Sequence, residues 1–433
     1  MGEIYNVAVE QDVVISIHPE LASQRLSDYA WQARAREFDL LVESSDCKLA
    51  DSLRVSLRRI ASATLFGAGK VEDIRLLVAT HEAQVVFVDH PLTPVQQSNL
   101  ETAWNAKVVD RTGLILEIFA SRARTREGVL QVELASMNYQ MGRLVRSWTH
   151  LERQRGGFGF MGGPGERQIE LDRRMIKTKI RSLEQDLAKI KQMRATQRAG
   201  RKKKALPTVA LVGYTNAGKS TLFNRLTDSG VYAADQLFAT LDPTLRLLEL
   251  GDHLSLMLSD TVGFVQELPH ELVDAFKATL EEVVEADLIL HVRDAADPMQ
   301  SEQAAVVRDT LEQLGLVGDF SPPIVEVLNK KDLAPELESY RAETIHGSRV
   351  AISAATGEGV DELLALLTDW LCREMHELHL KLALSDGRAL AFCHQHGSVL
   401  SKQCDGEVMD LVVRMNPADA RRFAMVDGIH HLQ

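Results

Sequence analysis

The chain has 433 residues, of which 45% are apolar and 25% are charged. These proportions exclude a wholly disordered or fibrous chain, and no apolar run reaches the roughly 18 residues that a membrane-spanning helix needs. Four cysteines are too few for a disulfide framework, so we expect a cytoplasmic protein, with peripheral membrane association left open. The net charge is −12, yet residues 141–204 carry 18 Lys and Arg against 6 Asp and Glu. This segment alone therefore predicts a polyanionic partner.

Residues 1–128 alternate short apolar runs with helical patterns. The runs at 76–78, 85–88 and 108–109 are typical of buried strands, and residues 94–104 have the pattern of a helix. This alternation predicts a small α/β domain with a largely parallel sheet.

Residues 129–204 change to heptad spacing, which is typical of paired helices. The first apolar seam comprises Leu130, Leu134, Met137, Met141, Leu144, Trp148 and Leu151. The second comprises Ile169, Ile176, Ile180, Leu183, Leu187 and Ile190. The stretch 153–165 between them is too rich in glycine to continue a helix. We therefore predict a basic antiparallel helical hairpin with a glycine-rich loop at its tip.

Two further domains are expected after the hairpin. Residues 205–373 form a second α/β unit. Residues 374–433 form a small α+β domain, with strands at 378–384 and 408–415 and helices at 387–400 and 417–423.

A P-loop opens the second α/β unit. An apolar strand at 209–212 leads into the pattern GxxxxGK[ST], and a plausible helix follows it. We expect its backbone N–H groups and the positive end of the helix to hold phosphates. Lys219 would reach the β- and γ-phosphates, and Ser220 would ligate Mg²⁺. The nucleotide-binding residues predicted here are Gly213, Tyr214, Thr215, Asn216, Ala217, Gly218, Lys219, Ser220 and Thr221.

Four further segments follow in the order that a GTPase requires. Asp260 ends an apolar strand and would hold Mg²⁺ through water, and the Gly263 N–H would contact the γ-phosphate. Thr240 is favoured as the switch threonine that closes on Mg²⁺, with Thr244 as its competitor. Asp332 would accept from guanine N1–H and N2–H₂, and the Ala354 N–H would lie near guanine O6. The residues assigned to the nucleotide from these segments are Asp260, Thr261, Val262, Gly263, Asn329, Lys330, Asp332, Ser353 and Ala354.

Two positions bear on the rate of hydrolysis. Ras-like enzymes orient the attacking water with a glutamine, but this chain has Phe264 there, whose ring has no polar group. We expect slow intrinsic hydrolysis that a partner accelerates, although Phe264 also fits a packed switch residue. Asn216 indicates either a K⁺ site beside the phosphates or an asparagine that stabilises the loop.

The hairpin tip combines positive charge with aromatic rings. Arg153, Arg155, Phe158 and Phe160 fit contacts with RNA phosphates and unpaired bases. The alternative is a solvated charged face with two phenylalanines that cap the seam.

Together these motifs resemble the HflX family of translational GTPases over nearly the whole chain. The resemblance rests on 69–72, 163–166, 172–174, the P-loop, 238–243 and 260–264. It implies an N-terminal HflX domain, the hairpin, a G domain and a short C-terminal domain. It also implies a GTPase that binds the large ribosomal subunit and its RNA, with Arg173 and Arg174 at the hairpin, and that splits stalled ribosomes under stress. A second, weaker ATPase activity is implied as well.

Several alternatives stay open. A ribosome-assembly or RNA-remodelling GTPase is the first rival, and a regulatory module whose hairpin binds a protein is the second. Cys393, His394, His396 and Cys404 fit no common zinc spacing and are expected to pack. We expect a monomer.

Overall fold

The computed structural model describes most of the chain in separate stretches. These are residues 11–24, 27–45, 47–154, 164–203, 206–227, 238, 240, 244–251, 254–265, 282–316, 321–334, 336, 342–344, 347–373, 375–415 and 417–424. They fall into two compact units. The first contains the described residues of Met1–Lys189, Ala234–Leu241 and Glu267–Lys277, and the second contains the rest.

The first unit is built on a four-stranded parallel sheet with the order β2-β1-β3-β4. Its elements are β1 (Val13–Leu21), a 3₁₀ turn (Ala22–Gln24), α1 (Asp28–Glu43), β2 (Lys48–Leu57), α2 (Ala68–His81), β3 (Val85–Val88), α3 (Pro94–Trp104), β4 (Lys107–Asp110) and α4 (Arg111–Arg122). The predicted parallel α/β domain is confirmed. The predicted strand at 76–78 is wrong, because these residues lie inside α2, where Leu76 is 53% exposed and only Ile74 and Val78 are buried.

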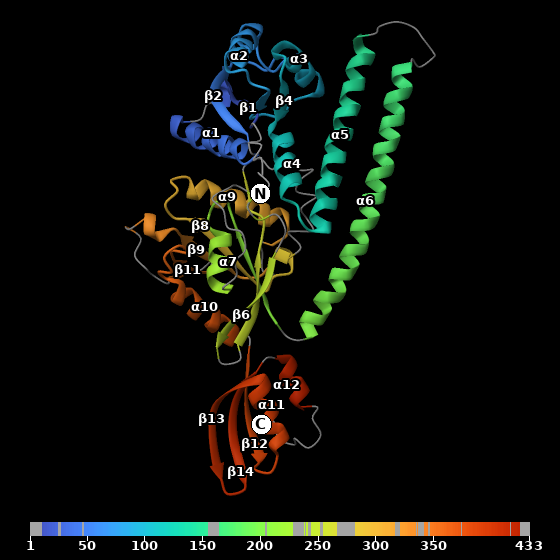
Figure 1. Ribbon diagram of the computed structural model, residues 1–433. Helices are drawn as coiled ribbons and strands as arrows, with labels where there is room; N and C mark the ends of the chain where they lie inside the picture. The colour runs from blue at the N-terminus through green and yellow to red at the C-terminus, as the bar shows by residue number, and fades with distance from the viewer. Residues whose placement is uncertain are drawn as a thin grey trace, which may run out of the picture. The chain divides into compact units, whose positions relative to one another are not determined.

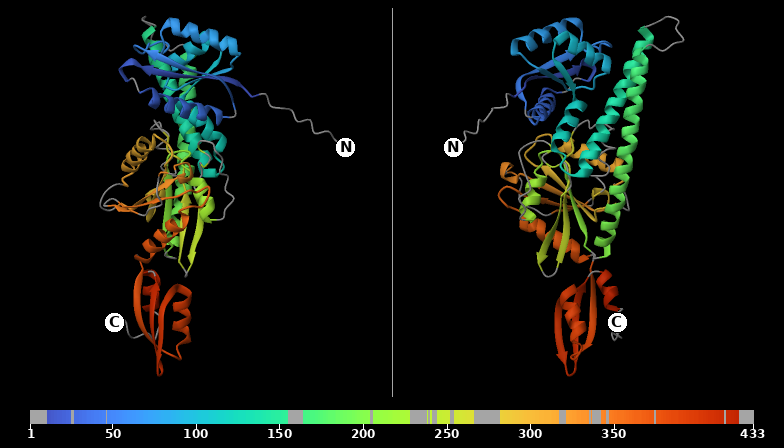
Figure 2. Two further views of the ribbon diagram at one scale, coloured as in Figure 1. Left: turned by 90° about the vertical axis from the view of Figure 1, so that its left-hand side faces the viewer. Right: turned by 45° about the vertical axis from the view of Figure 1, so that its right-hand side comes forward.

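Two long helices follow, α5 (Arg126–Gln154) and α6 (Pro164–Lys203), and they lie side by side (Figures 1 and 2). The second predicted seam is confirmed where Ile180, Leu183 and Leu187 are buried. The first seam is only partly right, since the most buried apolar residues among the described side chains of α5 are Val132 and Ala135. The side chains of Leu144, Trp148 and Leu151 in this seam, and of Ile169 in the second, lie outside the described residues. The physical reason is that α5 has a second partner: it also packs against α3 and α4.

The second unit contains a seven-stranded sheet with the order β10-β11-β9-β8-β5-β7-β6. Its inner strands are parallel, and the two edge strands, β10 and β6, are antiparallel to their neighbours. The strands are β5 (Thr208–Gly213), β6 (Thr244–Gly251), β7 (Leu254–Asp260), β8 (Leu288–Asp294), β9 (Ile324–Asn329), β10 (Ala342–Thr344) and β11 (Gly347–Ala351). The helices are α7 (Lys219–Thr227), α9 (Gln300–Gln313), a 3₁₀ turn (Lys331–Leu333) and α10 (Val360–Arg373).

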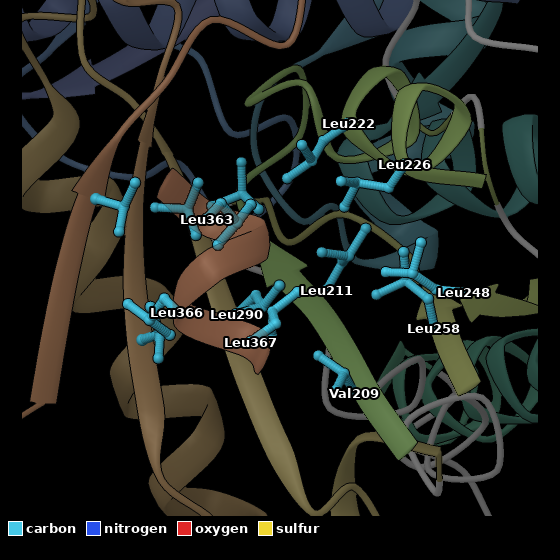
Figure 3. Close-up of a cluster of buried hydrophobic side chains, with 14 of the residues drawn as sticks. Val209, Leu211, Leu222, Leu226, Leu248, Leu258, Leu290, Leu363, Leu366 and Leu367 are labelled. Carbon is cyan, nitrogen blue, oxygen red and sulfur yellow. The ribbon is translucent and has the colours of Figure 1, made fainter. Parts of the chain in front are cut away.

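A leucine-rich core holds this sheet to α7 and α10 (Figure 3). Leu222 and Leu226 come from α7, and Leu363 and Leu367 come from α10. Both helices pack against the same face of the central strands. Because this packing fixes α7, its first residue lies at a defined position beyond the carboxyl end of β5. That edge of a parallel sheet is where open α/β folds bind ligands.

The tail residues form their own three-stranded antiparallel sheet with the order β12-β14-β13 (Figure 1). Its elements are β12 (His376–Ala383), α11 (Gly387–His396), β13 (Gly397–Asp405), β14 (Val408–Met415) and α12 (Pro417–Ala424). The predicted strands and the helix at 417–423 are confirmed. The helix predicted over 387–400 ends at His396, and its last residues belong to β13, a strand that the sequence did not reveal. The predicted fold class is therefore confirmed, and the boundaries at 128, 204 and 373 stay predictions.

Candidate nucleotide-binding site

The loop between β5 and α7 closes around the ammonium group of Lys219. Lys219 Nζ donates to the carbonyl oxygens of Gly213 and Tyr214 at 3.1 and 2.8 Å. Burial lowers the pKa of Lys219 to about 8, and the nearby charge of Asp260 opposes this shift. A buried ammonium ion that donates to neutral carbonyls would gain strongly from an anion at its tip. The geometry thus fits the predicted role of Lys219 in holding phosphate.

Two of the three residues predicted to hold magnesium meet next to this lysine. Ser220 Oγ donates to Asp260 Oδ2 at 2.7 Å, and Asp260 is fully buried at the end of β7. Hydroxyl and carboxylate oxygens are the ligands that Mg²⁺ prefers. Ser220 and Asp260 therefore fit the ion that the sequence predicts here.

The third predicted magnesium ligand, Thr240, belongs to the first compact unit. Two residues before it, Phe238 packs edge-on against Phe119 of α4, with ring centroids 4.6 Å apart. The competing Thr244 begins β6 and pairs with Asp260 across the ladder. The metal role of Thr240 stays a prediction.

The segment after Asp260 is joined to the P-loop by its backbone. Thr215 N–H donates to the Phe264 carbonyl at 2.8 Å, and Phe264 N–H donates to the Gly213 carbonyl at 3.1 Å. The Phe264 side chain is only 2% exposed, so Phe264 is a packed residue, and its ring also cannot orient water. A Cβ placed on Gly263 would lie 3.0 Å from Lys219 Nζ, which puts Gly263 beside the phosphate-binding lysine.

The residues predicted to read the base form a connected cluster. Asn329 Nδ2 donates to the Ala217 carbonyl at 2.8 Å, which links the end of β9 to the P-loop. Gly218 has φ +89°, and a Cβ there would lie 2.2 Å from Asn329 Nδ2, so only glycine allows this approach. Ser353 Oγ donates to Asp332 Oδ1 at 2.6 Å. The cluster is therefore ordered by bonds within the chain.

Two details of this cluster concern residues assigned to the nucleotide. The Ala354 N–H donates to Asn329 Oδ1 at 2.8 Å, so its predicted contact with guanine O6 stays a prediction. Lys330 adopts φ +62° and its ammonium lies 2.8 Å from Asp294. Of the remaining assigned residues, Tyr214, Thr215, Thr261 and Val262 are buried. Asn216 is exposed in the P-loop, and Thr221 is exposed near the start of α7.

One residue at this site has no counterpart in the sequence interpretation. Arg225 of α7 donates from Nε to the Ala354 carbonyl at 2.6 Å and from Nη2 to the Ala355 carbonyl at 2.5 Å. The P-loop pattern ends before Arg225, and its acceptors lie about 130 positions away along the chain. No local signal could have revealed this contact.

The residues predicted to touch RNA are only partly described. Arg173 and Arg174 are exposed on α6. Arg153 lies in the backbone of α5, with a side chain outside the described residues, and Arg155, Phe158 and Phe160 also lie outside them. Their RNA contacts stay predictions.

The expectation that the cysteines and histidines of the tail pack is only partly right, because His394 and Cys404 are exposed. Cys393 is fully buried, and burial raises the pKa of its thiol to about 11. Among the residues that the structure describes, no group of His, Cys, Asp or Glu could hold a metal ion. In the same described part of the chain, no helix is both long and apolar enough to cross a membrane.

The fold and the site define the class of protein: this chain is a P-loop GTPase. Three family models match it in chain order: a GTP-binding GTPase N-terminal region at 32–120, a GTP-binding GTPase middle region at 122–201 and a 50S ribosome-binding GTPase at 208–330.

Similar proteins identify its family. GTPase HflX of Magnetococcus marinus is 52% identical over 84% of each chain, and GTPase HflX of Escherichia coli is 45% identical over 90% of this chain and 91% of that one. The chain belongs to the HflX family of GTPases and hydrolyses GTP. Among solved structures, the chain also matches a GTP-binding protein from Sulfolobus solfataricus in complex with GDP, at 22% identity over 83% of this chain and 98% of that one, with a TM-score of 0.44.

Proposed function

We propose that this GTPase binds the large ribosomal subunit through its basic hairpin and uses GTP to separate the two ribosomal subunits. The exposed cationic side chains on α6 carry the proposal. Arg173, Arg174, Lys177 and Arg181 are all exposed, and lysines and arginines that neutralise phosphates supply affinity for RNA of any sequence. The G-domain match to 50S ribosome-binding GTPases supports the same partner, and a ribosomal partner places the protein in the cytoplasm.

The nucleotide site would act as the switch. Lys219 and the P-loop amides hold the phosphates, and Asp332 selects guanine. Ser220, Asp260 and Thr240 would hold Mg²⁺, which supplies positive charge to the β- and γ-phosphates. Closure of Thr240 and Gly263 on the γ-phosphate would order the switch segments, and hydrolysis would release them. Because Phe264 cannot orient water, we expect slow turnover until the ribosome supplies the missing group.

The deciding experiment mixes the protein with intact ribosomes and follows subunit separation by sucrose-gradient sedimentation. GTP or a non-hydrolysable analogue should separate the subunits, and GDP should not. GTPase rates measured with and without purified large subunits should differ by at least tenfold. If only precursor particles respond, the protein is an assembly factor, and if no ribosomal particle changes either measurement, the proposal is wrong.

A pair of arginine variants tests the hairpin separately. The double variant R173Q/R174Q should weaken binding to large subunits and lower the salt dependence of log K by about one unit per arginine. The matched control is R58Q/R59Q, which removes two adjacent exposed arginines from the N-terminal unit. Equal effects of both doubles would mean that net charge, not the hairpin, carries the affinity.

Asn216 can be tested for a K⁺ role in the same assay. It is exposed in the P-loop with φ +60°. A K⁺ site predicts faster ribosome-stimulated hydrolysis in KCl than in NaCl and a loss of that difference in N216A. Equal rates in both salts would leave only the role in loop stability.

A further inference from the structure

Arg225 connects the phosphate-binding helix to the loop that is assigned to the base. It lies on α7, whose first two residues are Lys219 and Ser220. Its guanidinium donates to two consecutive carbonyl oxygens, those of Ala354 and Ala355. A planar guanidinium can hold two acceptors at once in a fixed geometry, which a lysine ammonium cannot do. The contact therefore fixes the orientation of two successive peptide groups.

The second of these peptide groups leads to the base-reading carboxylate. Because a trans peptide is planar, holding the Ala355 carbonyl also fixes the Thr356 N–H on the opposite side. That N–H donates to Ser353 Oγ at 3.1 Å, and Ser353 Oγ donates to Asp332 Oδ1 at 2.6 Å. A path of three hydrogen bonds and one peptide group thus runs from Arg225 through Ser353 to Asp332.

The loop is shaped to admit the arginine. Gly357 has φ +96°, which favours glycine, and a Cβ there would lie 2.8 Å from Arg225 Nη1. The loop is closed by its own backbone as well, since Gly357 N–H donates to the Ser353 carbonyl and Ser353 N–H to the Glu358 carbonyl, each at 2.8 Å. Any larger residue at 357 would push the guanidinium away from its two acceptors.

We propose that Arg225 is a positioning residue for guanine selection. It holds loop 353–357 so that Ser353 orients the Asp332 carboxylate toward guanine N1–H and N2–H₂. The inference rests on the proposed assignment of Asp332 to the base. It makes base selection depend on the same helix that holds the phosphates.

The test compares the affinities of the full chain for GDP and IDP, which differ only in the N2 amino group. If Asp332 loses its orientation, GDP loses two hydrogen bonds, from N1–H and from N2–H₂, whereas IDP loses only the one from N1–H. In R225Q we expect GDP affinity to fall about tenfold and the GDP-over-IDP preference to fall about threefold, which corresponds to the loss of one or two ordinary hydrogen bonds. R225K should recover only part of the loss. The matched control R246Q alters an exposed arginine on β6 and should change neither value.

The GDP-over-IDP preference separates positioning from a merely structural role. If Arg225 only stabilises α7, both affinities fall by the same factor and the preference is unchanged, which would overturn the inference. Both nucleotides are titrated against one preparation, so a partly unfolded sample does not alter the preference. G357A is a second variant, and it should lower the preference in the same direction.

A double-mutant cycle tests the path through Ser353. Residues that act on one carboxylate should show a combined loss smaller than the sum of the single losses. We therefore expect R225Q/S353A to lose little more preference than S353A alone, and fully additive losses would contradict the path.

The variant D332N distinguishes a failure of the base assignment from a failure of the role of Arg225. If D332N keeps its guanine preference, the base assignment itself is wrong; if D332N loses it and R225Q does not, only the role of Arg225 fails.

Discussion

Both α/β units place polar residues where their parallel strands end, but they use them differently. In the N-terminal unit, Asp89 follows β3 and Arg111 begins α4, and Arg111 donates to Asp89 at 2.9 Å and to Glu37 at 2.7 Å. His18 of β1 lies 3.6 Å from Asp89 and 3.1 Å from Asp39. In the GTPase unit, Lys219 donates to backbone carbonyls. The first cluster, formed by Arg111, Asp89, Glu37, His18 and Asp39, balances charge within the fold. The second cluster, formed by Lys219 and the carbonyl groups around it, presents a cation to a loop that can hold phosphate.

The pKa shifts express the same difference. Burial works against ionisation of Asp89, yet its hydrogen bond to His18 and the charges of Arg111 and Arg34 hold its pKa well below the ordinary value. For Lys219 burial prevails and lowers the pKa to about 8. A buried charge that its own fold compensates is a structural element, and one that burial destabilises is ready for an external counter-charge.

The largest expected effect comes from breaking the first cluster. R111A would remove the guanidinium that lies 2.9 Å from the buried carboxylate of Asp89 and would leave Arg34 and His18 beside it. Breaking a buried ion pair in this way costs about 3–5 kcal/mol. The free energy of unfolding of the N-terminal unit should fall by this amount, measured by hydrogen exchange of residues 13–21 in increasing denaturant. GDP affinity should change by less than about twofold, within the scatter between independent sites. A loss below about 1 kcal/mol would show that the network is dispensable, as exposed ion pairs are.

The corresponding experiment in the GTPase unit removes the positive charge of Lys219. K219M keeps the apolar stem and removes the charge, so GDP affinity should fall about a hundredfold or more, because truncating a buried partner of a charged group costs about 2–5 kcal/mol. The free energy of unfolding without nucleotide should not fall, since the buried ammonium itself costs stability. Titration with a fluorescent GDP analogue and denaturant unfolding measure the two quantities. A large loss of stability would contradict the contrast with Arg111.

The pH dependence of nucleotide binding follows from the lowered pKa of Lys219. In the free protein Lys219 loses its proton above about pH 8, and bound phosphates favour the protonated form. Binding then takes up a proton, so GDP affinity should fall as pH rises from 8 to 9, by up to about fivefold. Calorimetry in buffers of different ionisation enthalpy detects the proton directly. K219R, which stays charged, should bind with no such pH dependence; a wild type with equal affinity at pH 7 and 9 would refute the assignment.

The sequence predicted those features whose residues lie close together along the chain. The P-loop, the strand before it and the segment from Asn329 to Asp332 are short patterns, and Asn329 contacts the P-loop through the Ala217 carbonyl. Arg225 was missed because its acceptors lie about 130 positions away, and Arg111 was missed because Glu37 lies 74 positions away. Three apolar residues at 76–78 fit a strand and a helix equally well, and only packing against the rest of the unit decides between them.

The smallest expected effect comes from the join between the N-terminal sheet and α5. Tyr139 of α5 donates to Asp110 Oδ1 at 2.6 Å, and Asp110 also accepts from the backbone N–H groups of Gly113 and Leu92 at 2.8 and 3.1 Å. Y139F removes one of several donors, so the carboxylate keeps partners and the loss should be only about 1 kcal/mol. Denaturant unfolding of the full chain measures it, with Tyr29, an exposed tyrosine of α1, as the matched position for a Y29F control. A cost as large as that of R111A would mean that the Asp110 carboxylate depends on this single bond and that its two backbone donors do not compensate for the loss.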